Sequence, residues 1–180
     1  MTLSKEVKTI SDFFFYFAFG SNLLQERLHV QIKGAQFVGV GYLKNYELCF
    51  FDYGTRWHGA IASIENNNAS EVYGCVWKVP NSFAEELDLQ ESGYHRLQIP
   101  VQLVKTNDTV DCRTYQYSNP ERKRQPPSPH YKKVIVEGAK EHELPKDYVN
   151  KLEDIKHNDY KGKVLLDLKA LKELNDAAEV

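Results

Sequence analysis

The sequence lacks the marks of exported, metal-binding and membrane-spanning proteins. It has only three cysteines (Cys49, Cys75 and Cys112), an odd number without the close spacing of a zinc site. We expect them to be reduced structural thiols. The apolar run Phe13–Phe19 is far shorter than the roughly 20 residues that a membrane span needs, and no small-residue cleavage pattern follows it. We therefore expect a cytoplasmic protein that binds neither a metal nor a membrane.

An excess of charge of either sign is also missing. Lysine and arginine number 23 and aspartate and glutamate 25, for a formal net charge of -2, so no global field attracts nucleic acid or anionic lipid. The basic cluster Arg122-Lys123-Arg124 runs into the proline-rich stretch Pro126–Pro129, which is typical of a stiff, exposed loop. A small molecule is the expected partner, and nucleic acid is not.

The 180 residues are enough for one sizeable core. We expect a loose N-terminal arm at residues 1–12, a single domain at 13–164 and a helical C-terminal tail at 165–180. Aromatic and β-branched runs predict strands at Phe13–Phe19, Phe37–Val40, Tyr46–Phe50, Gly59–Ile64, Glu71–Val79, Leu97–Val104 and Val110–Tyr117. Helical patterns occur at Leu23–Val30, Ser82–Gln90 and Pro145–Ile155. Without regular βαβ alternation, this pattern predicts an α+β fold: a small mixed or antiparallel β-barrel with flanking helices.

The turn after the first predicted strand is a candidate site. The apolar strand stops at Gly20-Ser21-Asn22, and an amphipathic helix follows from Leu23. Asn22 suits the N-cap position, with Gln25 completing a capping box, and the free backbone N–H groups there suit a carboxylate. The alternative is an ordinary turn, in which glycine supplies a positive φ and Asn22 only caps the helix.

Glu91 is the second candidate. The capping-box spacing of Ser82 and Glu85 predicts a helix that places Phe83, Leu87 and Glu91 on one face. A carboxyl group on the apolar face of a helix is desolvated, which raises its pKa toward neutrality and fits it for both proton uptake and release. The alternative is that the helix frays before Glu91 and leaves an ordinary surface glutamate.

Several motifs in one order carry a family resemblance: Tyr16–Leu23, Trp57–Gly59, Val72–Trp77, Leu87–Glu91, Pro126–Lys133, Gly138–Lys140 and Asn158–Lys163. Together they resemble the γ-glutamylcyclotransferase family from about Tyr16 to Val164. The resemblance implies a barrel-containing α+β fold, a homodimer, and conversion of a γ-glutamyl amino acid to 5-oxoproline and a free amino acid. It also implies a substrate-binding loop formed by Tyr16, Phe17, Ala18, Phe19, Gly20 and Ser21, with Glu91 as the catalytic acid/base and Tyr131 reaching the pocket from the proline-rich loop.

Such a substrate carries its own nucleophile, because its α-amine is one five-membered ring closure from the γ-carbonyl. We therefore expect no protein nucleophile, metal or cofactor, and one glutamate to move the protons. The amides around Gly20 would hold either the α-carboxylate or the developing oxyanion. The chain departs from the family twice: Phe19 stands where tyrosine is usual, and Ser92-Gly93 replaces a longer loop after Glu91.

Three other interpretations remain open. His58 or His130 could act as a metal ligand or base, although neither has a second ligand at suitable spacing. The chain could be a binding protein that keeps the scaffold without turnover. It could also be a cyclotransferase that acts on γ-glutamylamines or on glutathione, since these relatives share the turn and the glutamate.

Overall fold

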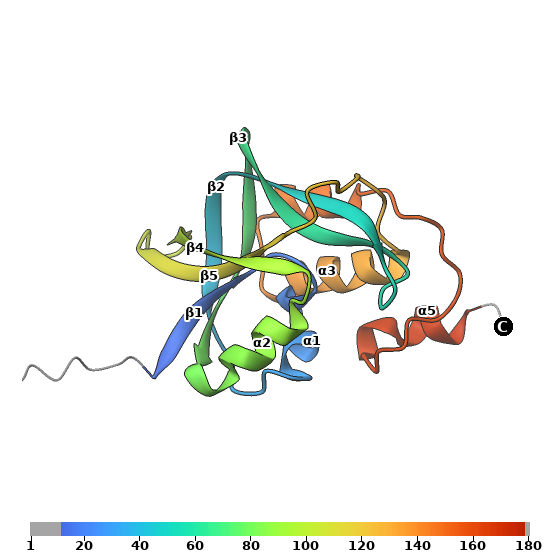
Figure 1. Ribbon diagram of the computed structural model, residues 1–180, viewed down its shortest axis with the longest axis horizontal. Coiled ribbons are helices and arrows are strands. Elements are labelled where there is room, and N and C mark those ends of the chain that lie inside the picture. Colours follow the sequence, from blue (N-terminus) through green and yellow to red (C-terminus); the bar gives the residue numbers. More distant parts are fainter. Residues whose placement is uncertain (1–11, 179–180) are drawn as a thin grey trace, which may run out of the picture.

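Five strands close into a barrel in the computed structural model, which describes residues 12–178. The order around the barrel is β1-β3-β2-β4-β5 (Figure 1). The strands are β1 (Phe13–Ala18), β2 (Gln36–Gly54), β3 (Gly59–Pro80), β4 (Tyr94–Leu103) and β5 (Thr109–Tyr117). β1 runs antiparallel to β3 and parallel to β5, where Tyr16 pairs with Arg113. The α+β prediction of a small mixed barrel with flanking helices is confirmed.

The barrel has fewer and longer strands than the sequence predicted. β2 contains both Phe37–Val40 and Tyr46–Phe50, and β3 contains both Gly59–Ile64 and Glu71–Val79. The polar residues that suggested breaks form a bulge instead, because pairing passes from Lys44 opposite Glu71 to Tyr46 opposite Asn66. The two long strands therefore form one continuous hairpin of the barrel.

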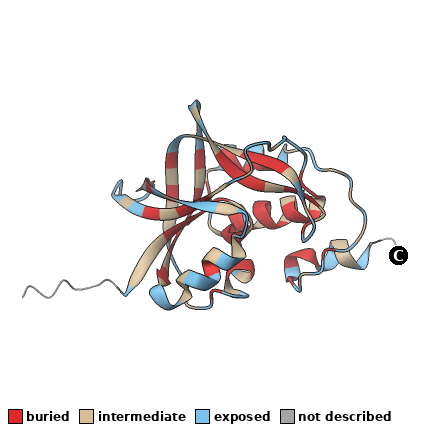
Figure 2. Cartoon of the chain, viewed as in Figure 1, coloured by how far each residue is buried: buried red, intermediate tan, exposed pale blue. Residues whose placement is uncertain are grey.

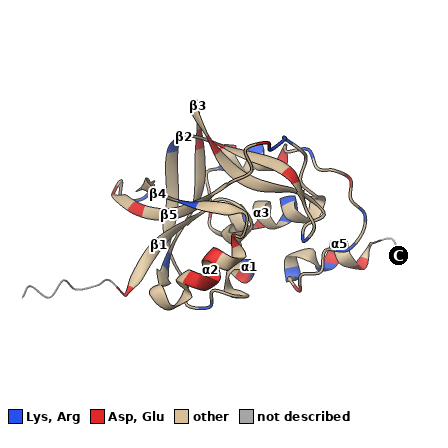
Figure 3. Ribbon diagram, viewed as in Figure 1, with Lys and Arg blue, Asp and Glu red and all other residues tan. Residues whose placement is uncertain are grey.

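The helices lie outside the barrel (Figure 1). They are α1 (Gln25–His29), α2 (Ala84–Gln90), α3 (Pro129–Glu141), α4 (Lys146–Glu153) and α5 (Lys172–Asp176), with 3-10 turns at Ser21–Leu23, Asn81–Phe83 and Lys169–Leu171. Figure 3 shows how acidic residues gather on α2. The predicted helices correspond to α1, α2 and α4, each with shorter bounds.

α3, the longest helix of the described chain, was not predicted from the sequence. The proline-rich stretch runs directly into the start of α3. Pro129 occupies the first turn of the helix, and the Ser128 hydroxyl caps the helix by accepting the Tyr131 N–H at 3.1 Å. Tyr131 is therefore held on a helix, and not on a loop as expected. A Cβ at Gly138 would lie 2.5 Å from the Leu24 nitrogen, so this glycine allows α3 to approach the turn after β1 closely.

Both capping predictions are wrong. Neither Asn22 nor Ser82 makes a side-chain cap, and the helices begin after Leu24 and Phe83. The first N–H of α1 is instead bound by the Glu141 carboxylate from the end of α3, which accepts from the Gln25 nitrogen at 3.0 Å. Local spacing cannot reveal a cap that is supplied from 116 residues away.

The core fills the barrel and the space between it and α3 (Figure 2). Leu168 and Leu171 are buried too, so the C-terminal segment packs on the domain. The predicted boundaries at 164 and 165 stay predictions. All but Asp12 of the expected arm at 1–12 lies outside the described residues. No helix between residues 12 and 178 is long and apolar enough to cross a membrane.

Candidate active site

A cavity of about 320 Å³ opens where four segments meet. These are the turn after β1, the tip of the β2–β3 hairpin, the end of α2 and the start of α3. Its size suits a small-molecule site. The turn and Glu91 are 70 residues apart in the sequence, and the barrel brings both to the same wall.

The backbone of Glu91 is fixed on both sides. α2 ends at Gln90, but the Glu91 N–H still donates to the Leu87 carbonyl at 3.1 Å. The Glu91 carbonyl accepts from the Tyr94 N–H at 3.0 Å, across a tight turn in which Gly93 has a φ of 91°. The helix therefore does not fray before Glu91, and the next strand begins at once.

The Glu91 carboxyl group lies in the cavity wall with little hydrogen-bonding support. Desolvation raises its pKa to about 7, while the positive charge of Arg27 and a contact from the Tyr16 hydroxyl act in the opposite direction. That hydroxyl donates to Oε1 at 3.4 Å. A carboxyl group with this pKa is present in both protonation states at neutral pH.

Tyr16 belongs to a buried polar row behind Glu91. Its hydroxyl accepts from Nδ2 of Asn22 at 3.1 Å, and the side-chain amides of Asn22 and Gln90 are 2.9 Å apart. Burial, followed by the charge of Glu91, raises the pKa of Tyr16 well above its usual value. Asn22 thus supports the tyrosine next to Glu91 instead of capping a helix.

A second wall of the cavity is built on Ala62 of β3. Its N–H donates to the Tyr131 hydroxyl at 3.2 Å, and its carbonyl accepts from the Tyr94 hydroxyl at 2.6 Å. Trp57 from the hairpin tip stacks on the Tyr131 ring, with centroids 4.6 Å apart. The Tyr131 hydroxyl accepts from the main chain here, so its own proton is free to donate to a ligand in the cavity.

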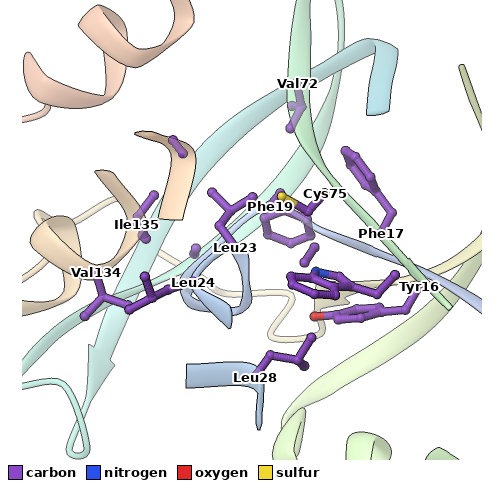
Figure 4. Packing of buried hydrophobic residues seen from close by; sticks show 14 of the residues in the cluster. Tyr16, Phe17, Phe19, Leu23, Leu24, Leu28, Val72, Cys75, Val134 and Ile135 are labelled. Carbon is purple, nitrogen blue, oxygen red and sulfur yellow. The ribbon is translucent and has the colours of Figure 1, made fainter. Parts of the chain in front are cut away.

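Most of the sequence-predicted residues meet at this cavity: Tyr16, Phe19, Gly20, Ser21, Glu91 and Tyr131 all line it. Phe17 and Ala18 do not. Figure 4 shows Tyr16 and Phe17 on opposite sides of β1, and the Phe17 ring packs close to Gly74 in the core. Gly20 has a φ of −113°, so a positive φ is not the reason for glycine here.

Sequence reasoning missed Arg27, Trp57 and Tyr94 as lining residues. A signal for Arg27 was present, because it follows Leu23 by four positions and is therefore a charged residue on an apolar face. The same pattern singled out Glu91. Trp57 and Tyr94 come from a hairpin tip and a strand start, where local spacing says little about direction.

The residues of the rival interpretations lie elsewhere. His58 stacks on Tyr160, with centroids 4.4 Å apart, and neither His58 nor the buried His130 lines the cavity. Across residues 12–178, no three His, Cys, Asp or Glu side chains form a group suited to a metal ion. Arg122 and Arg124 are ion-paired with Glu65 and Glu47 respectively, so two charges of the basic cluster fasten a loop to the barrel.

Known proteins resemble this chain over most of its length. The AIG2-like family matches residues 71–152. A protein from Bos taurus named gamma-glutamylcyclotransferase is 44% identical over 84% of this chain and 83% of its own, and its namesake from Homo sapiens is 42% identical over the same shares. A solved structure of a gamma-glutamyl cyclotransferase, 39% identical, superposes with a TM-score of 0.83 over 91% of this chain and 96% of its own. This chain belongs to the γ-glutamylcyclotransferase family.

Proposed function

We propose that the cavity converts a γ-glutamyl amino acid to 5-oxoproline and a free amino acid, with Glu91 as the acid/base. The observation that carries the proposal is the Glu91 carboxyl group in the cavity wall, whose pKa burial raises to about 7. Family membership supports the activity. The position of Glu91 beside the turn after β1 supports its role.

The reaction needs a folded substrate and the transfer of two protons. Glu91 takes a proton from the α-ammonium, and the freed amine attacks the γ-carbonyl carbon to form the ring C–N bond. As the bond to the leaving nitrogen breaks, neutral Glu91 protonates that nitrogen. The second proton of the former amine follows through Glu91 or water, so the amino acid leaves as an ammonium ion. No electron carrier and no covalent enzyme intermediate take part.

The remaining wall residues either adjust the protonation of Glu91 or bind the substrate. Tyr16 donates to Glu91 and so favours its ionised form, which is the form that accepts the first proton. The Tyr131 hydroxyl faces Gly20, since a Cβ there would lie 3.5 Å from it, and it retains a proton to donate. The first N–H groups of the 3-10 turn at Ser21 and Asn22 have no partner within the turn, which suits them to a substrate oxygen. Holding the folded conformer supplies much of the acceleration.

Purified protein should be incubated with a panel of γ-glutamyl amino acids, a γ-glutamylamine and glutathione, and 5-oxoproline should be measured. We expect product from at least one γ-glutamyl amino acid. Folded protein that forms none from any member would favour the binding-protein interpretation. Product only from the amine or from glutathione would assign the chain to that narrower specificity.

We also propose a cytoplasmic homodimer. Three buried free cysteines, Cys49, Cys75 and Cys112, fit a reducing compartment. The dimer follows from the family resemblance. Light scattering at two protein concentrations tests it, and a mass of one chain at both would contradict it.

A further inference from the structure

The guanidinium group of Arg27 is a charge in the cavity wall that forms no ion pair within the described chain. Arg27 is only 3% exposed, and it lines the cavity together with Glu91. No carboxylate of the described chain forms an ion pair with it, and its Nε is buried without any hydrogen-bond partner. The Gln90 amide oxygen can accept either from Asn22 or from Arg27: only when it is turned toward Arg27, and so away from Asn22, do Nη1 and Nη2 donate to it, at 3.0 and 3.3 Å. Within residues 12–178 this neutral amide is the hydrogen-bond acceptor that the guanidinium finds, and the charge of Glu91 attracts it without forming an ion pair.

Burial of the Arg27 charge costs free energy unless a further group pairs with it. Arginine stays protonated in proteins, and a buried charge without a counter-ion loses much of its hydration energy. A second guanidinium, that of the exposed Arg56, lies at the same cavity and disfavours the Arg27 charge further. The face of the Trp57 ring lies 6.0 Å away and offers only a weak attraction. Both cations therefore favour an anion inside the cavity.

We propose that Arg27 binds the α-carboxylate of the substrate and thereby makes a free α-carboxylate a condition for binding. This inference rests on the proposed function, because it places a γ-glutamyl group in the same cavity. A guanidinium presents paired N–H donors that match the two oxygens of a carboxylate, which a single amide cannot do. The amides of the turn are then left for the γ-carbonyl oxygen.

The positions of Arg27 and Glu91 agree with the chemistry of the α-carbon. That carbon bears both the ammonium that Glu91 must deprotonate and the carboxylate. Arg27 lies close enough to lower the pKa of Glu91, yet the two do not form an ion pair within the described residues. A cation and a carboxylate that stand apart in one cavity can each receive the oppositely charged group of an amino acid head.

The first test uses unmodified protein and two ligands. 5-Oxoproline and its α-carboxamide differ only in the charged group, and their dissociation constants can be measured by calorimetry. We expect 5-oxoproline to bind about 10- to 100-fold more tightly, the range for hydrogen bonds to a charged partner. Equal affinities, or no binding of 5-oxoproline, would overturn the proposal.

Variants then assign the preference to a residue. Arg27→Gln should reduce the affinity ratio of the two ligands to near 1, and Arg27→Lys, which keeps the charge without the paired donors, should leave an intermediate ratio. Lys33→Gln removes an exposed cation outside the cavity lining and should keep the full ratio. Loss of the ratio in Arg56→Gln, with the ratio kept in Arg27→Gln, would transfer the role to Arg56 and refute the proposal. If Arg27→Gln does not fold, Arg27→Lys and the unmodified protein decide.

The binding test separates this inference from the proposed function. Turnover without a carboxylate preference would refute the role of Arg27 and leave the cyclotransferase activity intact. Folded protein that prefers 5-oxoproline through Arg27 but forms no product would support the role of Arg27 and refute the cyclotransferase activity.

Discussion

Glu47 on β2 and Glu91 after α2 show how two glutamates of one barrel come to differ. Glu47 accepts from Arg124, from Cys49 Sγ at 3.2 Å and from Asn67 Nδ2 at 2.7 Å, and these donors lower its pKa to about 2. Within the described chain the Glu91 carboxylate accepts one hydrogen bond, at 3.4 Å, and burial raises its pKa to about 7. The sequence records both simply as glutamate.

The cations show the same contrast. Arg124 and Arg122 each have a carboxylate partner and hold the loop before α3 against the barrel, whereas Arg27 has none among the described residues. Ion-paired charges therefore stabilise one side of the barrel, whereas charges without an ion pair among the described residues line the cavity. Charged groups that the protein leaves without partners are available to a ligand.

The largest effect should come from Glu91→Gln. This change keeps the shape of the side chain and removes its proton transfer, so we expect kcat to fall by about 10²- to 10⁴-fold with substrate binding retained. Initial rates of 5-oxoproline formation measure it. In the unmodified enzyme, kcat/KM should decline as the pH falls below about 7, because the base becomes protonated.

Glu86→Gln is the matched control, since Glu86 is exposed on α2, the helix that precedes Glu91, and does not line the cavity. Asp88 is unsuitable because it accepts from the Tyr115 hydroxyl at 2.6 Å, and Tyr115 lines the cavity. Normal turnover in Glu91→Gln would move the catalytic role to another residue.

The stability of the same variant should depend on pH. A carboxyl group with a raised pKa stabilises the fold below its unfolded pKa of about 4.5, and this contribution is lost as the pH rises through about 7. At pH 9, Glu91→Gln should therefore be more stable than the unmodified protein by about 2 to 3 kcal/mol, with near equality at pH 4.5. Urea unfolding at the two pH values tests this. A less stable variant at pH 9 would show that Glu91 is better solvated than its position indicates.

Removal of the Glu47 carboxylate should change the free energy of unfolding in the opposite direction and by a smaller amount. Glu47→Gln removes a carboxylate with a lowered pKa, whose contribution is present above about pH 4.5 and lost as the pH falls toward 2. Because the site is partly solvated, we expect a loss of only about 1 kcal/mol at pH 7, which shrinks at pH 3. Chemical unfolding at both pH values measures it. Turnover should stay unchanged, and a fall in kcat would link this network to the cavity.

The smallest change should come from Phe19→Tyr. It adds a hydroxyl group to the cavity lining, at the position where the resemblance to the family leads us to expect tyrosine. One new hydrogen bond to substrate would lower KM by about 2- to 10-fold with little change in kcat. Steady-state kinetics on the best γ-glutamyl amino acid give the answer. An unchanged or higher KM would show that the hydroxyl does not reach the substrate.

The sequence predicted the features that depend on local pattern. Apolar runs gave the strands, and the spacing of Leu87 and Glu91 placed a carboxylate on a buried face. It could not predict partners that the barrel brings together: the cap that Glu141 gives to α1, or the contact of Asn22 with Tyr16 and Gln90. Phe17 and Ala18 were included because the family loop includes them, although strand alternation turns Phe17 into the core.

The main chain and the side chain of Ala62 have separate roles in the cavity. Its peptide groups, and not its side chain, fix the hydroxyl groups of Tyr131 and Tyr94, while its methyl group forms part of the cavity wall and would lie 3.4 Å from a Cβ at Gly20. The depth of the cavity and the placement of its tyrosines are therefore separately adjustable. We expect Ala62→Gly to widen the cavity without removing the main-chain partners of either hydroxyl group.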